Sequence, residues 1–182
     1  MSNYRRKYTK GGTYFFTIVM YRRQKILCDD VIRTTLRNAI KITRQTHSFE
    51  IDAWVLMPDH LHCIWTLPAG DSNFTTRWAM IKRIVTKQCA VIYQRNQWLN
   101  RSKLKRKEST LWQRRFWEHQ IRDERDYQEH FDYIHFNPVH HGYVLAVNDW
   151  EFSSFHRYVR DGIYPENWGD LVGDYEGLEE PK

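Results

Sequence analysis

The 182-residue chain lacks the features typical of secreted and membrane-spanning proteins. Its three cysteines, Cys28, Cys63 and Cys89, are odd in number and far apart, so they predict neither a disulfide framework nor a zinc site. The first residues are charged and have no apolar core, unlike a signal peptide. No stretch reaches the roughly 18 consecutive apolar residues that a membrane span needs. We therefore expect a cytoplasmic protein with no membrane partner.

Acidic residues are scarce over most of the chain. Residues 1–160 carry 27 basic and 15 acidic side chains, whereas the last 22 residues carry seven acidic side chains and one lysine. We therefore divide the chain into a basic domain, residues 1–162, and an acidic tail, residues 163–182. Because 15% of the residues are aromatic, the domain suits nucleic acid, with cations on phosphates and rings on unpaired bases. An ordinary basic surface is the alternative.

The hydrophobic pattern alternates between strand and helix periods. Runs rich in β-branched and aromatic residues predict strands over 12–22, 49–57, 61–67 and 115–122. Helical spacing predicts helices over 29–47, 75–94 and 123–137, the last ended by Pro138, and a short helix within 150–162. The polar, basic residues 95–113 are predicted to form a flexible loop. This order predicts an α+β fold: a ferredoxin-like (split βαβ) antiparallel sheet, two helices on one face and the tyrosine-bearing helix 123–137 on the other.

The run "PDHLHCIW" places two histidines in a predicted strand. Alternation puts His60 and His62 on one face, with Leu61 and Cys63 facing the core. The two histidine Cα atoms then lie roughly 6.6–7 Å apart, so that both imidazoles can bind one cation. Two histidines that merely face water are the alternative.

Tyr133 and Asn137 are four residues apart and therefore share one side of the predicted helix. A helix packed on the open face of the sheet would direct both toward the histidines. The Asn137 carbonyl oxygen would be a third ligand for a hard ion such as Mg²⁺ or Mn²⁺. A half-buried tyrosine and a helix-capping asparagine are the alternative.

"PDHLHCIW" and "DYIHFNPVHHGYV" together resemble the HUH transposases, single-strand DNA enzymes that use one tyrosine. "GGTYFFT", "FWEHQIRDERDY" and "WEFSSFHR" resemble, more narrowly, the REP-associated tyrosine transposases, over about residues 4–160. The resemblance implies that His60, His62 and Asn137 bind Mg²⁺ or Mn²⁺, and that Tyr133 attacks the scissile phosphate to form a 5′-phosphotyrosine. It also implies a substrate, single-stranded DNA beside a hairpin of a repetitive extragenic palindrome (REP).

Three clusters are candidates for DNA binding, because they combine cations or hydroxyls with aromatic rings. They are Arg5, Arg6, Lys7, Tyr8 and Lys10; Arg114, Arg115 and Trp117; and Ser153, Ser154, His156 and Arg157. Solvated faces above buried aromatic residues are the alternative. The basic segment 95–113 is longer than the family pattern, which leaves its DNA contacts open.

Two other kinds of protein fit the same residues. One is a ferredoxin-like nucleic-acid-binding module without catalysis, including a repressor, and the other is a nuclease that activates water. The resemblance favours a monomer, although related insertion-sequence enzymes are dimers with swapped helices. Asp59, Glu118 and His119 are the candidates for a general base, and the sequence selects none of them.

Overall fold

The computed structural model describes residues 9–169 and is built on one four-stranded antiparallel sheet. The strands are β1 (Thr13–Val19), β2 (Glu50–Leu56), β3 (His60–Thr66) and β4 (Trp117–Gln120). The α-helices are α1 (Asp30–Thr46), α2 (Phe74–Tyr93), α3 (Arg101–Lys105), α4 (Glu124–His140) and α5 (Phe155–Arg160). Three short 3₁₀ helices join them: η1 (Tyr21–Arg23), η2 (Asn96–Trp98) and η3 (Val147–Asp149).

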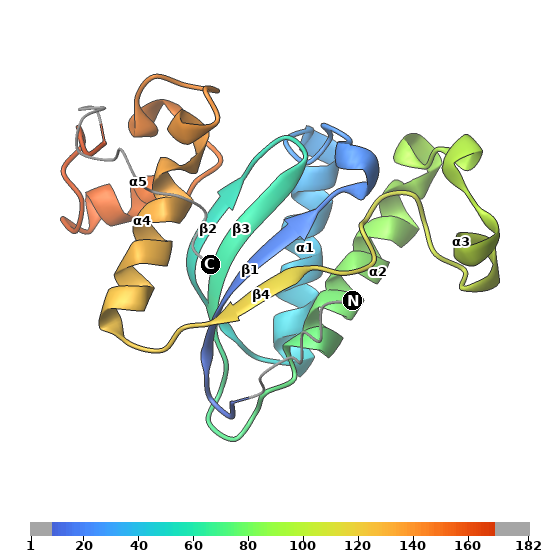
Figure 1. Ribbon diagram of the computed structural model, residues 1–182, viewed down its shortest axis with the longest axis horizontal. Helices are drawn as coiled ribbons and strands as arrows, with labels where there is room; N and C mark the ends of the chain where they lie inside the picture. The colour runs from blue at the N-terminus through green and yellow to red at the C-terminus, as the bar shows by residue number, and fades with distance from the viewer. Residues whose placement is uncertain (1–8, 170–182) are drawn as a thin grey trace, which may run out of the picture.

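The strand order is β2-β3-β1-β4, so that β3 lies between β1 and β2 and splits the first βαβ unit. Helices α1 and α2 cover one face of the sheet, and α4 covers the other, with α5 beside it (Figure 1). This confirms the predicted α+β antiparallel sheet, with two helices on one face and the tyrosine-bearing helix on the other.

The larger core lies between the sheet and helices α1 and α2. Alternation along β3 directs Leu61, Cys63 and Trp65 into it, as predicted. The Trp65 ring stacks on Trp78 of α2 with centroids 4.1 Å apart. Burying such large rings removes much apolar surface from water, which favours this packing.

The second core lies between the opposite face of the sheet and α4. Phe15 of β1 and Ile64 of β3 meet Phe131 and Ile134 of α4. The side chains of His60 and His62 belong to this face by the same alternation. The packing of α4 thus brings a helix face directly over the paired histidines.

Several predicted elements are shorter in the structure by a few residues, and two predictions differ more substantially. Residues 95–113 contain η2 and α3 rather than a continuous loop, and the buried Lys103 ammonium donates to the Ser109 carbonyl oxygen at 2.8 Å. Helix α4 continues past Pro138 to His140. A proline in a helix removes one backbone hydrogen bond, and we attribute its tolerance here to the burial of α4 around Pro138. Asn137 therefore lies inside the helix and does not cap it.

Residues 152–154 extend the sheet at the β2 edge. The Leu56 amide donates to the Phe152 carbonyl oxygen, and the Ser154 amide donates to the Trp54 carbonyl oxygen. Farther along the chain, the Tyr164 and Trp168 rings pack on each other with centroids 4.4 Å apart and join the second core. The division between residues 162 and 163 stays a prediction, because most of the predicted tail lies outside the described residues. Between residues 9 and 169, no helix has the length and apolar character needed to cross a membrane.

Candidate active site

His60 and His62 are buried under α4, and their rings lie 4.8 Å apart. His60 Nδ1 is 2.7 Å from Asp59 Oδ1, and His62 Nδ1 is 2.9 Å from Thr17 Oγ1. Partners of this kind fix the orientation of an imidazole and leave its Nε2 for a ligand. Burial is the largest cause that lowers the pKa of both histidines, which favours the neutral form that binds metals.

Tyr133 and Asn137 face these histidines from α4. The Tyr133 ring centroid is 5.3 Å from that of His62, and the tyrosine is 4% exposed. Asn137 is fully buried, and neither its amide oxygen nor its amide nitrogen has a hydrogen-bond partner of ordinary geometry within residues 9–169. Asn137 nevertheless lies close enough to His60 to raise the pKa of that imidazole, an effect that the larger one of burial outweighs.

This environment fits a divalent cation. A buried amide without a partner costs free energy, and coordination of its oxygen would recover part of that cost. Mg²⁺ accepts an amide oxygen, and Mn²⁺ accepts both an amide oxygen and neutral imidazoles. The structure thus brings together the three predicted ligands and the predicted nucleophile, while their roles stay predictions.

Two residues near the histidines were not predicted. Arg23 Nη1 lies 3.5 Å from His60 Nδ1, and the His141 ring centroid is 5.4 Å from that of His60. Arg22 and Arg23 have φ angles of 55° and 54°, which are uncommon for non-glycine residues and which nothing in the sequence indicates. His141 could have been found, because it is four residues after Asn137 and so shares its side of the helix.

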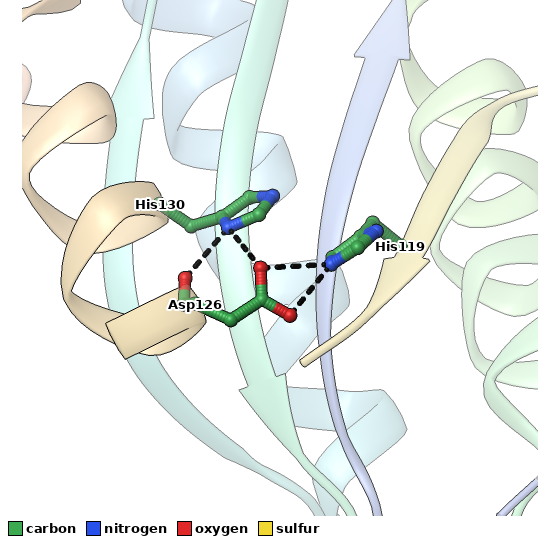
Figure 2. A group of neighbouring side chains, drawn as sticks. All are labelled: His119, Asp126 and His130. Carbon is green, nitrogen blue, oxygen red and sulfur yellow. Dashed lines mark hydrogen bonds and ion pairs between the residues drawn. The ribbon is translucent and has the colours of Figure 1, made fainter. Parts of the chain in front are cut away.

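A second histidine cluster joins β4 to the first turns of α4. His119 Nε2 lies 2.9 Å from the Asp126 carboxylate, and His130 Nδ1 lies 3.2 Å from it (Figure 2). The backbone amide and the guanidinium of Arg122 donate to the same carboxylate. Burial alone would raise the pKa of Asp126, but the hydrogen bonds from Arg122 and His119 lower it well below its usual value.

The three side chains of this second cluster are also spaced closely enough to be considered as metal ligands. One donor atom from each of His119, Asp126 and His130 lies within 4.8 Å of the others, a spacing that a metal ion could bridge. The carboxylate is already hydrogen-bonded to His119 and Arg122, while His130 Nδ1 is hydrogen-bonded to the Asp126 backbone carbonyl oxygen at 2.7 Å and lies 3.2 Å from the carboxylate. We therefore assign this cluster the structural role of fixing α4, which carries Tyr133, against the sheet. His119, a candidate general base, is held in this cluster by Asp126.

The first two candidate DNA clusters are partly accessible. Lys10 and Arg115 are exposed, whereas Arg5, Arg6, Lys7 and Tyr8 lie outside the described residues. Arg114 is exposed and forms an ion pair with Glu108 at 2.6 Å. Trp117 is half-buried, with its ring centroid 5.6 Å from that of Phe15. DNA binding by these residues stays a prediction.

The third cluster makes hydrogen bonds within the protein. Ser154 Oγ accepts from the Trp54 amide at 2.9 Å and lies 2.8 Å from His135 Nε2. Arg157 donates to the Asp52 carbonyl oxygen at 2.6 Å. Ser154 and Arg157 therefore join α5 and the segment before it to the β2 edge. Two more side chains are held locally: Ser153 Oγ accepts from the Phe155 amide, and His156 Nε2 lies 3.0 Å from the Trp150 carbonyl oxygen. Their DNA-binding role also stays a prediction.

The sequence and the fold place the chain in a class of transposases. Residues 8–137 match the family described as "Transposase IS200 like". The chain is 45% identical over 179 residues to a REP-associated tyrosine transposase of Escherichia coli (strain K12), covering 98% of each chain. A solved structure of a REP-associated tyrosine transposase bound to a REP hairpin is 44% identical, with a TM-score of 0.79, over 100% of this chain and 99% of that one. The chain belongs to the IS200-like transposases and, within them, to the REP-associated tyrosine transposases.

Proposed function

We propose that this transposase cuts and rejoins single-stranded DNA beside REP-type hairpins through a covalent bond between Tyr133 and a 5′ phosphate. The observation that carries the proposal is the position of Tyr133, whose ring lies 5.3 Å from that of His62 across the second core. The related transposase of known structure was solved bound to a REP hairpin, which supports this choice of substrate.

His60, His62 and Asn137 would hold the divalent cation, Mg²⁺ or Mn²⁺. When bound, the cation would polarise the scissile phosphate and stabilise the charge that develops there. Asp59 and Thr17 would keep the two imidazoles oriented through their Nδ1 atoms. Arg23 is exposed beside His60 and carries a positive charge, so it would contact a phosphate at the same place.

The chemical step would be a transesterification. The Tyr133 phenol loses its proton, its oxygen bonds to phosphorus, the bond from phosphorus to the 3′ oxygen breaks, and that oxygen takes up a proton. One phosphodiester is exchanged for another, so the bond energy is retained and rejoining needs no nucleotide triphosphate. The cluster around Asp126 would contribute indirectly, because it fixes α4 against β4.

Covalent capture of DNA by four proteins tests the proposal. A labelled oligonucleotide, with a hairpin and a single-stranded flank, is incubated with Mg²⁺ or Mn²⁺ and run on a denaturing gel. Wild type should give a protein–DNA band that disappears without the ion, in Tyr133→Phe and in His62→Ala. Tyr127→Phe, a change of the same kind on the same helix, should retain the band.

The other outcomes would contradict the proposal. Cleavage that survives Tyr133→Phe and leaves no protein on the DNA would identify water as the nucleophile. Hairpin binding without cleavage under either ion would identify a binding module without catalysis.

A further inference from the structure

Helix α4 ends beside the paired histidines in a turn that fixes the position of Tyr143. The Gly142 amide donates to the Val139 carbonyl oxygen at 2.8 Å. The Tyr143 amide donates to the Pro138 carbonyl oxygen at 2.9 Å, which completes a Schellman motif. Gly142 has a φ angle of 68°, which glycine adopts without strain. The chain therefore turns back after α4, and the Tyr143 ring centroid lies 6.4 Å from that of His141.

Aromatic rings continue from this turn away from the candidate active site. The His141 ring centroid lies 5.4 Å from that of the buried His60. Beyond Tyr143, the next ring is that of Trp150, with centroids 5.6 Å apart. Trp150 Nε1 donates to the Leu56 carbonyl oxygen at 2.9 Å, which fixes the indole at the end of the sheet where β2 turns toward β3 (Figure 1). We call His141, Tyr143 and Trp150 the aromatic track.

The aromatic track is accessible to solvent, in contrast to the rings of the two cores. His141 is exposed, Tyr143 is 39% exposed and Trp150 is half-buried. The planes of neighbouring rings are inclined by 52° and 41°, so neither pair is stacked face to face. A contiguous group of accessible rings marks a binding surface more often than one exposed ring does. Such rings are the feature on which unpaired bases stack.

The charges beside the aromatic track favour bases over a run of phosphates. Arg23 lies at its inner end, 3.5 Å from His60 Nδ1, with a side chain that is 60% exposed. At the outer end, the exposed Asp149 and Glu151 precede and follow Trp150 in the sequence. One cation and two carboxylates give little attraction for the closely spaced phosphates of a duplex. The track therefore suits the unpaired part of a nucleic acid.

We propose that the aromatic track binds unpaired bases of the single-stranded flank, on one side of the scissile phosphate. This inference rests on the proposed function, which places that phosphate at His60, His62 and Tyr133. Because the His141 ring contacts the His60 ring, a strand held at the histidines would pass directly onto the track. Every base has a π-face, so stacking would hold the strand without selecting its sequence.

A cycle of changes in the protein and in the DNA tests the inference. Tyr143→Leu keeps an apolar side chain but removes the ring, whereas Tyr143→Phe keeps the ring. Leu145→Ala, at a 91% exposed position on the same segment, is the control. Dissociation constants are measured by fluorescence anisotropy, without divalent ions and over a range of salt concentrations. The DNA is a hairpin with single-stranded flanks, or the same hairpin with flanks whose nucleotides lack their bases.

Tyr143→Leu should bind the hairpin with intact flanks about fivefold or more weakly than wild type does, as expected for the loss of one stacked base. Its plot of log Kd against log salt should keep the wild-type slope, because the substitution removes no charge. Tyr143→Phe and Leu145→Ala should bind like wild type. On the abasic flanks, Tyr143→Leu and wild type should bind equally. Unchanged circular dichroism spectra and melting temperatures would show that the variants fold.

Three results would overturn the inference. Equal losses by Tyr143→Leu on intact and abasic flanks would mean that the ring does not contact bases. Wild-type affinity of Tyr143→Leu, or an equal loss in Leu145→Ala, would mean that the track does not bind the flank. A loss in Tyr143→Phe as large as that in Tyr143→Leu would assign the effect to the hydroxyl instead of stacking. Each result is separable from a failure of the proposed function, because the covalent bond to Tyr133 is scored on a gel and binding is measured without cleavage.

Discussion

We predict that the Asp126 carboxylate, near the beginning of α4, makes a large contribution to the stability of the fold. It is 3% exposed, accepts hydrogen bonds from Arg122 and lies 2.9 Å from His119 Nε2. His130 Nδ1 lies 3.2 Å from the carboxylate, and its hydrogen bond goes to the Asp126 backbone carbonyl oxygen at 2.7 Å. Asp126→Asn keeps the shape of the side chain but removes its charge and turns an N–H group toward these donors. Because the Arg122 side chain is 68% exposed, its share is screened and small. Weakening the hydrogen bond with the half-buried His119 and the charge contact with the buried His130 should cost about 2–3 kcal/mol.

Chemical denaturation at several pH values would measure this effect. The pKa of Asp126 is depressed in the folded state, so its contribution is fully present above the unfolded pKa of about 3.9 and is lost as the pH falls through the folded pKa. The difference in unfolding free energy between wild type and Asp126→Asn should therefore stay constant from neutral pH down to about pH 5 and shrink below about pH 4.

A matched variant separates this network from a general change in charge. Glu129→Gln removes one carboxylate from the same helix, where it pairs with the 89% exposed Arg125, and should cost less than about 0.5 kcal/mol. Equal effects of the two substitutions, or a difference that grows as the pH falls from 5 to 3, would refute the assigned role of Asp126.

Further predictions concern the metal site and the β2 edge. Thr17→Val removes the hydroxyl 2.9 Å from His62 Nδ1, so the affinity for Mn²⁺, measured by calorimetry, should fall about 10- to 100-fold with little change in melting temperature. Unchanged affinity would mean that the hydroxyl does not orient that imidazole for a metal. Ser154→Ala leaves the Trp54 amide without its side-chain acceptor and should cost about 1–3 kcal/mol of unfolding free energy. If stability is kept and only DNA affinity falls, Ser154 contacts DNA instead of supporting the sheet edge.

Periodicity predicted most of the fold because the two faces of the sheet are both buried. The alternation along β3 separated Leu61 and Trp65 from His60 and His62, and the structure places the first pair in the core under α1 and α2. The spacing of Tyr133 and Asn137 likewise predicted that one helix face would carry both. These are local regularities, which a sequence expresses directly.

Contacts outside the regular helix and strand periods could not be predicted in the same way. The short helix α3 is polar, and its one buried cation, Lys103, is satisfied by the Ser109 carbonyl oxygen, a contact that no periodicity indicates. Pro138 was expected to end α4, but tertiary packing outweighs one lost hydrogen bond. The proximity of Arg23 to His60 depends on a left-handed backbone that arginine seldom adopts.

The central claim is that Tyr133 forms a covalent bond with DNA, and peptide mass spectrometry tests it most directly. Wild type is incubated with a hairpin substrate and Mg²⁺ or Mn²⁺, then digested with protease and nuclease. We predict a single modified peptide that carries a nucleotide on Tyr133 through its 5′ phosphate, with a free 3′ hydroxyl on the released strand. A nucleotide on any other residue, or cleaved DNA with a 5′ phosphate and no attached peptide, would contradict the account.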